Sequence, residues 1–470
     1  MKIAIIAEGS YPYVTGGVSS WLHTLLQSMP EHEFVIYAIG AEQKDRGKFK
    51  YELPSNVSEI REVFLDSYLQ EEGRPSGRYG LDPNQIHALK SLFVREDAPD
   101  WKQVFDTLRN ADMKSVADFL MSRDFFDIIH QLCQERYLYV PFTEMFWTAR
   151  SMVVPLFLLL REPVPQADLY HCVTTGYAGV IGSLAKHLYG KPMLLTEHGI
   201  YSREREEEII KASWVKGYFK DLWIDYFYKL AGCAYHYADR VVTLFNRNRE
   251  IEIELGCDPD KIQIVPNGIE TADFAALPGK EPGDERIHIG AFVRIVPIKD
   301  IKTMVQSFAL VKQEMPQASF YIMGPFDENE EYYEECVQLA EDLGLGSEMF
   351  TGNVPLFSYL GKMDVLALTS ISEGQPLAVL EGMAAGKPFV ATDVGSCKEL
   401  LYGAHDDYGE AGIVVPVMNS ERIASAILTL CRNTELRNRM GENGRKRVGE
   451  YYTKKAFIDA YKSLYQSCER

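Results

Sequence analysis

The sequence lacks the features that mark several common classes of protein. None of its eight cysteines pairs with another at the spacing of a metal site or a disulfide framework, which fits a reducing cytosol. A long hydrophobic run is also missing, since the longest, Met152–Leu160, is about half of the ~20 residues that a membrane-spanning helix needs. We therefore expect a cytoplasmic protein with no transmembrane helix.

Acidic residues outnumber basic residues in the chain. The chain has 49 lysines and arginines against 67 aspartates and glutamates, and its formal net charge is −18 at pH 7. This balance argues against nucleic acid and anionic lipid as partners. An anionic ligand must therefore meet a local cluster of basic residues.

The first residues show no secretory signal. The apolar run Lys2–Ala7 ends at Glu8 and has no cleavage site, so we expect a first β-strand there. At 470 residues the chain is too long for one hydrophobic core, which predicts two or three domains.

The most informative stretch of the sequence is Glu373–Glu381. The apolar run Asp364–Ser370 precedes it and has the length of a buried parallel strand. Pro376 suits the first turn of a helix, so a strand, a glycine loop and a helix follow one another. This order places free N–H groups near Leu377 and Ala378 at the carboxyl edge of a sheet, where anions and sugar hydroxyls bind.

Glu373 and Glu381 are suited to hold opposite ends of one extended ligand. At ~1.5 Å per residue, Glu381 lies about 7 Å along the helix axis from Pro376. A carboxylate accepts two hydroxyl donors, so each glutamate matches a vicinal diol. A helix cap plus a surface glutamate is the alternative interpretation of this pair.

Three other motifs lie between a predicted strand and a predicted helix. Gly16 and Gly17 follow the first strand at the entrance to a helix, where glycine permits a positive φ and lets the backbone approach a ligand closely. His198 follows a predicted strand at residues 192–196, where open α/β sheets bind ligands. Arg294 and Lys299 supply the local positive charge that the composition demands.

Alternating strands and helices predict two α/β domains, at residues 1–270 and 285–454. A helical, aromatic stretch at about 66–165 interrupts the first. We interpret it as an insertion that binds an acceptor or a partner, or that only enlarges the core. A helix at residues 455–470 is expected to pack back on the first domain.

These motifs together resemble the signature of retaining glycosyltransferases of family 4. That family has the GT-B fold, which implies two Rossmann-like domains facing across a cleft, the first for the acceptor and the second for the nucleotide-sugar donor. The resemblance rests on four motifs in the family's order: Gly16-Gly17, Glu197-His198-Gly199, Arg294 with Lys299, and Glu373 with Glu381.

The resemblance also implies a role for each residue. Arg294 and Lys299 would stabilise the departing diphosphate, Glu373 would hold the donor sugar, and Glu381 would hold the ribose. His198 would lie beside the reaction centre, which makes it the fourth catalytic candidate with Arg294, Lys299 and Glu373. The other donor-binding positions implied are Gly16, Gly17, Gly352, Asn353, Gly374, Gln375, Pro376 and Leu377.

The same resemblance bears on cofactors and partners. The co-substrate would be a nucleotide sugar, with no cofactor and no metal, and we discount Asp258-Pro-Asp260 as a metal site because it lies in a turn. Tyr11–Trp21, Thr196–Arg205 and the long insertion resemble the enzymes of Pel exopolysaccharide synthesis. This implies a UDP-sugar donor, a saccharide acceptor and membrane-embedded polysaccharide synthase partners, which would bring the protein to the inner face of the cell membrane.

The expected reaction is transfer of a sugar to an acceptor hydroxyl with retention at the anomeric carbon. A glycoside hydrolase also uses two carboxylates but has no use for an Arg-Lys pair aimed at a diphosphate. A phosphorylase of similar fold would need a lysine-bound cofactor. A non-catalytic nucleotide-binding subunit of a polysaccharide synthase complex stays open, because a sequence can keep a binding site after losing turnover.

Overall fold

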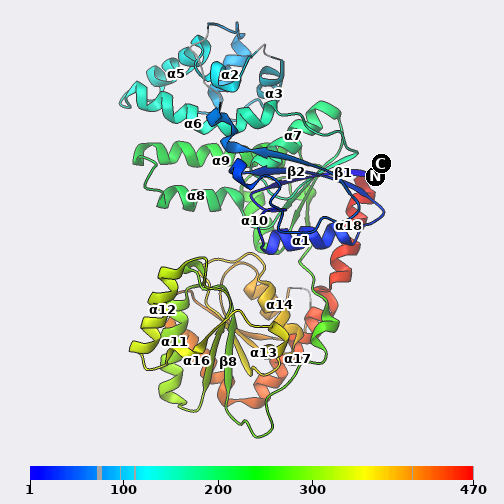
Figure 1. Cartoon of the computed structure of the whole chain (residues 1–470), viewed down its shortest axis with the longest axis vertical. Helices are drawn as coiled ribbons and strands as arrows, with labels where there is room; N and C mark the ends of the chain where they lie inside the picture. Colours follow the sequence, from blue (N-terminus) through cyan, green and yellow to red (C-terminus); the bar gives the residue numbers. More distant parts are fainter. Residues whose placement is uncertain (71–76, 96, 111–112, 405, 469–470) are drawn as a thin grey trace. The chain divides into compact units, whose positions relative to one another are not determined.

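The computed structural model describes residues 1–70, 77–95, 97–110, 113–404 and 406–468, which form two compact units (Figure 1). Unit 1 contains Met1–Thr243, Arg249–Ile264 and the end of the chain from Lys462. Unit 2 contains Leu244–Asn248 and Val265–Tyr461. Each unit has its own parallel sheet and its own hydrophobic core.

Unit 1 is built on a seven-stranded parallel sheet with the order β3-β2-β1-β4-β5-β6-β7. Its central strands are buried on both faces, as continuous apolar sequences in a covered parallel sheet require. The strand order reverses between β1 and β4, which is where open α/β sheets bind ligands. The strands are β1 (Lys2–Glu8), β2 (Glu33–Gly40), β3 (Val57–Phe64), β4 (Leu169–Cys172), β5 (Met193–Glu197), β6 (Arg240–Thr243) and β7 (Ile262–Ile264).

Helices flank this sheet, and the end of the last helix of the chain joins the same unit. In that helix, Tyr465 hydrogen-bonds through its hydroxyl to Nδ1 of the buried His171, at 2.8 Å. The last two residues of the helix expected at 455–470 lie outside the described residues. The helices are α1 (Gly17–Gln27), α7 (Tyr177–Tyr189), α8 (Tyr201–Lys211), α9 (Gly217–Tyr237), α10 (Asn246–Glu254) and α18 (Lys454–Cys468).

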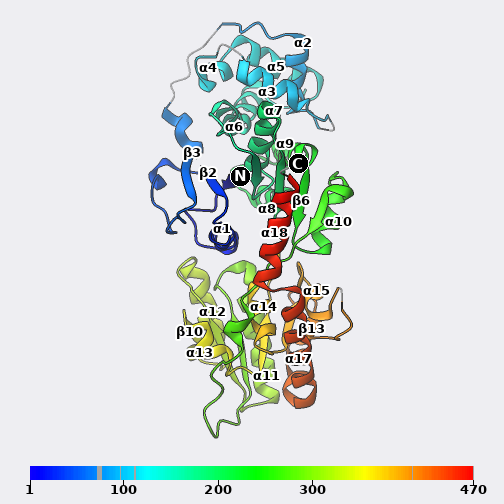
Figure 2. The ribbon, with the colours of Figure 1, turned by 90° about the vertical axis from the view of Figure 1, so that its right-hand side faces the viewer.

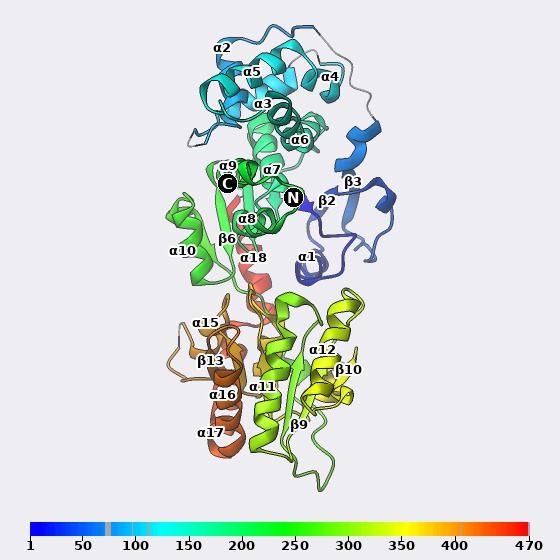
Figure 3. The same ribbon diagram turned by 90° about the vertical axis from the view of Figure 1, so that its left-hand side faces the viewer.

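The stretch between β3 and β4 is helical, as the sequence predicts, and its helices gather at one end of the unit (Figures 2 and 3). Parts of the expected insertion, at 71–76, 96 and 111–112, lie outside the described residues. Rings from different helices pack together, for example Phe125 and Phe146 at 5.7 Å between centroids. The helices are α2 (Pro83–Ser91), α3 (Trp101–Asn110), α4 (Val116–Leu120), α5 (Arg123–Glu135) and α6 (Phe142–Arg161).

By length and composition alone, α6 could cross a membrane, and it is the one such helix in the ranges that the structure covers. Its most apolar window is 56% buried within unit 1. Glu144 and Arg150 lie within the same helix, which is the composition of a core helix with one polar face.

Unit 2 repeats the same arrangement with six parallel strands in the order β10-β9-β8-β11-β12-β13. Its strands are β8 (His288–Phe292), β9 (Ser319–Met323), β10 (Phe350–Gly352), β11 (Val365–Leu368), β12 (Phe389–Thr392) and β13 (Gly412–Val415). Its helices are α11 (Ile301–Glu314), α12 (Glu330–Asp342), α13 (Leu356–Leu360), α14 (Leu377–Ala384), α15 (Cys397–Tyr402), α16 (Ser420–Arg432) and α17 (Thr434–Tyr451). The predicted α/β class with two Rossmann-like units is confirmed.

One expected strand is much shorter than the sequence suggests. β7 covers only Ile262–Ile264, and the chain leaves the sheet before Pro266. Pro266 has no N–H group to donate to a ladder. The next N–H group, that of Asn267, instead donates to Gln375 Oε1 at 2.6 Å.

Candidate functional site

The carboxyl edge of the unit 2 sheet carries most of the predicted donor-binding residues. All of its strands are parallel, so the loops that follow them meet at one edge. Arg294 and Lys299 follow β8, Glu373 follows β11, and Gly352 ends β10 with Asn353 exposed directly after it. The structure thus brings the second-domain motifs to one edge of one sheet.

Lys299 and Glu373 form a direct ion pair at this edge. Lys299 Nζ lies 2.5 Å from Glu373 Oε1, and the two side chains are only 16% and 10% exposed. Ser370 Oγ donates to the same carboxylate oxygen at 2.5 Å. The ammonium group of Lys299 is therefore shielded from most of the solvent and held in a fixed position.

The backbone around this pair is held by the loop that follows β11. Thr369 Oγ1 donates to the carbonyl oxygens of Lys299, at 2.9 Å, and Asp300, at 3.1 Å. The N–H group of Ile371 donates to the carbonyl of Ile298 at 2.9 Å. These bonds join two loops that lie about seventy residues apart in the sequence.

The position of Glu373 also depends on a glycine from a third loop. Gly395 has a φ of +51°, and a Cβ there would lie 2.2 Å from the carbonyl oxygen of Gly374 and 2.3 Å from that of Glu373. Ser396 N donates to the same Gly374 oxygen at 3.0 Å. Only glycine allows this approach.

Replacing Gly395 with alanine should lower the free energy of unfolding of unit 2 by about 3 kcal/mol, because a strained φ and a steric clash add together. It should also weaken nucleotide binding, since the clash moves Glu373. Urea unfolding and titration with UDP measure both effects. Gly344→Ala is the matched control, because Gly344 has a φ of +71° with no heavy atom within 4 Å of the added Cβ. Equal midpoints and equal affinities for the two variants would refute this account of the loop.

Arg294 lies in a more open environment than Lys299. Its Nη1 donates to both carboxylate oxygens of Glu328, at 2.8 and 2.7 Å, and the two side chains are 53% and 48% exposed. An exposed pair of this kind contributes about 0–1 kcal/mol to stability. A diphosphate carries more charge and more oxygen atoms than a carboxylate, so it can replace Glu328 as the partner of the Arg294 guanidinium.

The start of α14 offers backbone donors at the same edge. The first intrahelical bond is donated by Val379 to the carbonyl of Pro376 at 3.1 Å, so the N–H groups of Leu377 and Ala378 precede it. Pro376 stands one residue before the helix instead of in its first turn, which corrects the sequence prediction.

Glu381 is a largely buried carboxylate in α14. Among the described residues, its side chain has no hydrogen-bond or ion-pair partner. Burial raises its pKa to about 7. A desolvated carboxylate without a partner costs free energy that hydroxyl donors from a ligand would offset.

In unit 1, His198 follows directly on β5. Its Nε2 is buried and has no hydrogen-bond partner in the part of the chain that the structure describes. The ring meets Trp21 edge to face, with centroids 4.6 Å apart at 80°. Burial lowers the pKa of His198 to about 4, so the imidazole is neutral at physiological pH.

The ¹⁵N resonances of His198 should show one neutral tautomer from pH 5.5 to 8. In a Trp21→Ala variant, water should enter and the midpoint should move up toward the ordinary value of about 6.5. Long-range ¹H–¹⁵N NMR of both proteins makes the comparison. A titration midpoint above pH 5.5 in the unchanged protein would contradict the buried, neutral imidazole.

Unit 1 also contains two buried glutamates to which the sequence assigns no role. Glu197 accepts hydrogen bonds from the Tyr235 hydroxyl at 2.6 Å and from the N–H group of Tyr201 at 3.1 Å. Glu8, at the end of β1, accepts from the N–H group of Ala178 at 3.1 Å. Burial raises the pKa of both carboxyl groups. Their one sequence signal is an acidic residue that closes an apolar strand.

Gly16 and Gly17 lie where α1 begins. Gly16 has a φ of 171°, which is ordinary extended backbone, so it does not use the positive φ that glycine permits. The positive φ of this loop, +59°, belongs to Gly9. A Cβ on Gly16 or Gly17 would have no heavy atom within 4 Å, so the loop presents bare backbone to open space.

No group of three or more His, Cys, Asp or Glu side chains within the described ranges could hold a metal ion. Asp258 accepts a hydrogen bond from the N–H group of Asp260 at 3.0 Å and so caps a short turn. All eight cysteines are free.

Two family models match the chain, and together they span most of it. The first, described as "Domain of unknown function (DUF3492)", matches residues 1–260. The second, "Glycosyl transferases group 1", matches residues 279–447 and therefore the whole candidate site of unit 2.

Individual proteins resemble the chain over much of its length. It is 26% identical over 328 residues to UDP-Gal:alpha-D-GlcNAc-diphosphoundecaprenol alpha-1,3-galactosyltransferase of Escherichia coli, covering 67% of this chain and 78% of that protein. It is 28% identical over 318 residues to the putative glycosyltransferase EpsD of Bacillus subtilis, covering 63% and 76%. The crystal structure of Anabaena HepE in complex with UDP matches with a TM-score of 0.63 and 16% identity, over 99% of this chain and 100% of that one. The fold is therefore GT-B.

Proposed function

We propose a reaction for this chain, which belongs to the DUF3492 family and is a GT-B glycosyltransferase that uses a nucleotide sugar. The chain transfers a sugar from a UDP-sugar to a saccharide hydroxyl, with retention of configuration at the anomeric carbon. The observation that carries the proposal is the Lys299–Glu373 pair, enclosed at the carboxyl edge of the unit 2 sheet. A GT-B enzyme needs a cation there for the leaving diphosphate.

In this proposal, Arg294 and Lys299 neutralise the charge that develops on the diphosphate, and the N–H groups at the start of α14 add to it. Glu373 keeps Lys299 in place and accepts hydrogen bonds from the donor sugar. Glu381 accepts the ribose hydroxyls. The bond from the anomeric carbon to the diphosphate oxygen breaks through an oxocarbenium-like transition state. The acceptor oxygen forms the new bond on the same face, and the proton of the acceptor hydroxyl passes to the departing diphosphate.

His198 has a different role in the proposal. Its neutral imidazole donates one hydrogen bond or accepts one, and the orphaned Nε2 has room for a partner. A sugar hydroxyl at the reaction centre would satisfy it. Gly16 and Gly17 leave the backbone beside α1 open to the same substrate.

Two similarities support UDP as the nucleotide. The Escherichia coli relative is named for a UDP-Gal donor, and HepE was crystallised with UDP. We further propose that the protein belongs to family 4 and to the PelF type, and works in exopolysaccharide synthesis beside membrane-embedded synthase partners. Tyr11–Trp21 and Thr196–Arg205 support that assignment by resemblance. No metal or cofactor enters the proposed reaction, because Arg294 and Lys299 supply the positive charge.

The test is a panel of sugar nucleotides followed by NMR of the product. UDP should raise the melting temperature more than GDP or ADP, and one UDP-sugar should be consumed when a saccharide acceptor is present. Retention predicts an anomeric configuration in the product equal to that in the donor, and an inverted product refutes it. UDP binding without turnover on any acceptor would instead indicate a non-catalytic subunit. Cleavage of oligosaccharides without a nucleotide would indicate a glycoside hydrolase.

A further inference from the structure

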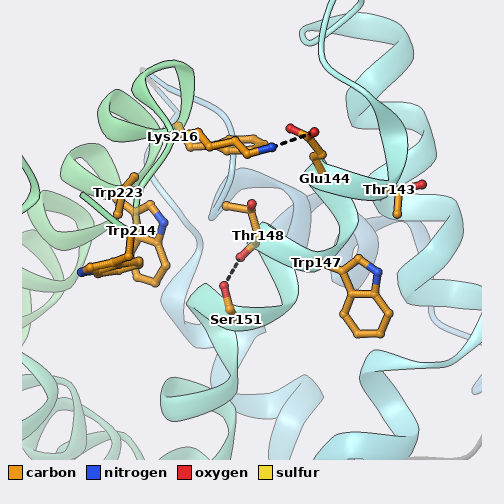
Figure 4. A pocket seen from close by; sticks show the side chains of 10 residues that line it. Thr143, Glu144, Trp147, Thr148, Ser151, Trp214, Lys216 and Trp223 are labelled. Atoms are coloured by element: carbon orange, nitrogen blue, oxygen red, sulfur yellow. Dashed lines mark hydrogen bonds and ion pairs between the residues drawn. The ribbon is translucent and has the colours of Figure 1, made fainter. Parts of the chain in front are cut away.

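A separate cavity of about 320 Å³ lies in unit 1, where α6 passes the loop between α8 and α9 (Figure 4). Three of the five tryptophans in the chain line it, namely Trp147, Trp214 and Trp223. None of the predicted donor-site residues lines this cavity. The cavity therefore needs an explanation of its own.

Two of these tryptophans, Trp147 and Trp214, are exposed, whereas Trp223 is buried. Trp214 is 69% exposed, and its ring meets Trp223 edge to face with centroids 5.5 Å apart at 84°. Trp147 is 50% exposed and has the guanidinium of Arg150 5.5 Å from its ring centroid. Large aromatic side chains left in water and braced by their neighbours are typical of binding sites.

A polar strip of α6 runs between these rings. Glu144, Thr148 and Ser151 are spaced to share one helix face. Lys216 Nζ lies 2.8 Å from Glu144 Oε1, and the Tyr218 hydroxyl donates to the other carboxylate oxygen. Figure 4 shows Trp214 and Trp223 on one side of the strip and Trp147 on the other.

This combination matches the surface of a sugar ring. A pyranose has a C–H face that packs on the negative face of an indole, and a rim of hydroxyls that bond to carboxylate, ammonium and hydroxyl groups. An anionic membrane suits the site less well, because Glu144 lines the cavity and the net charge of the chain is −18. A protein partner would have to bury the Glu144–Lys216 pair at a cost in desolvation.

The cavity lies one helix away from the proposed reaction centre. α8 begins at Tyr201, three residues after His198, and ends at Lys211, three residues before Trp214. Its eleven residues span about 16 Å. A ligand that reaches both His198 and the cavity is therefore a chain of several sugar units.

We propose that this tryptophan-lined cavity binds a neutral pyranose unit of the acceptor saccharide, several units away from the hydroxyl that reacts. The inference rests on the proposed function, because it takes the acceptor to be a saccharide chain. The cavity holds the chain in place while its reactive end meets the donor. It also gives the helices between β3 and β4 a role in acceptor binding, since α6 supplies the polar strip.

The first test measures saccharide binding without any donor. An array of immobilised bacterial oligosaccharides should retain the unchanged protein, and Trp214→Ala should reduce that retention about tenfold, as the loss of one stacked ring implies. Tyr139→Ala is the matched control, because Tyr139 is a fully exposed aromatic residue outside the cavity. UDP affinity should be the same in all three proteins. Equal retention of the Trp214 variant, or no retention of the unchanged protein, would overturn the proposal.

The second test uses acceptor length. Trp214→Ala should raise KM about tenfold for acceptors of several sugar units, and leave kcat and the KM for a monosaccharide acceptor unchanged. An equal effect on short and long acceptors would overturn the proposal, and so would a change in sedimentation showing that the cavity joins two copies of the chain. If the array retains the protein but no UDP-sugar is turned over, the proposed function fails and the saccharide site stands.

Discussion

Replacing Lys299 with alanine should lower kcat for sugar transfer about 100-fold, the loss that follows removal of one preorganised donor to developing negative charge. The ammonium is 16% exposed and held by Glu373, so it is already positioned for the leaving diphosphate. Initial rates at saturating donor measure the effect. Donor KM should change much less than kcat, because the charge is largest in the transition state.

Lys302→Ala is the control for this experiment. Lys302 lies three residues further along, is 42% exposed and pairs with Glu335 on the surface. Its replacement should leave the rate unchanged. Equal rates for the Lys299 variant and the Lys302 variant would remove Lys299 from the mechanism.

Replacing Glu381 with glutamine should have opposite effects on binding and on stability. Affinity for UDP should fall about 10- to 100-fold, since hydrogen bonds to a charged group contribute about 1.5–3 kcal/mol. Without ligand, the variant should be more stable than the unchanged protein above pH 7. Isothermal titration and urea unfolding at pH 8 measure the two effects.

The sign of the stability effect follows from the pKa of Glu381, which burial raises from the ordinary value of 4.5 to about 7. Between these two values the folded state binds more protons than the unfolded state, so the stability of the protein falls as pH rises through this window. Above pH 7 the loss is complete and amounts to at most about 3–4 kcal/mol, at about 1.4 kcal/mol per pKa unit. Glutamine carries no charge and avoids the loss.

Glu334→Gln is the matched control, because Glu334 is exposed on α12 of the same unit. It should change neither UDP affinity nor the pH dependence of unfolding. In the unchanged protein, UDP affinity should rise as pH increases through 7, when the carboxylate forms. A Glu381 variant that binds UDP as tightly as the unchanged protein would show that this carboxylate does not hold the ribose.

Local sequence patterns predicted the parts of the fold that are buried on both faces. β1 and β11 are almost wholly buried and were identified from continuous apolar runs. β3 was missed because it is an edge strand in which only Val63 and Phe64 are buried, and the charged residues Glu59, Arg61 and Glu62 interrupt its apolar pattern. β13 was missed because it is a strand of only four residues, at the edge of the unit 2 sheet opposite β10.

The candidate site shows the same limit. Residues within one motif, such as Glu373 and Glu381, are visible in the sequence because their spacing is local. The pairing of Arg294 with Glu328, 34 residues away, depends on the order of β8 and β9 in the sheet. The contact of Trp21 with His198 depends on the strand order of unit 1. Sequence spacing alone does not encode these distances.

The most direct test of the account is a crystal structure of the chain with UDP bound. We predict that the diphosphate lies within hydrogen-bonding distance of Lys299 Nζ and Arg294, and that the ribose hydroxyls donate to Glu381. Ordered UDP elsewhere on the molecule, with Lys299 still bound only to Glu373 and no ligand at Glu381, would contradict it.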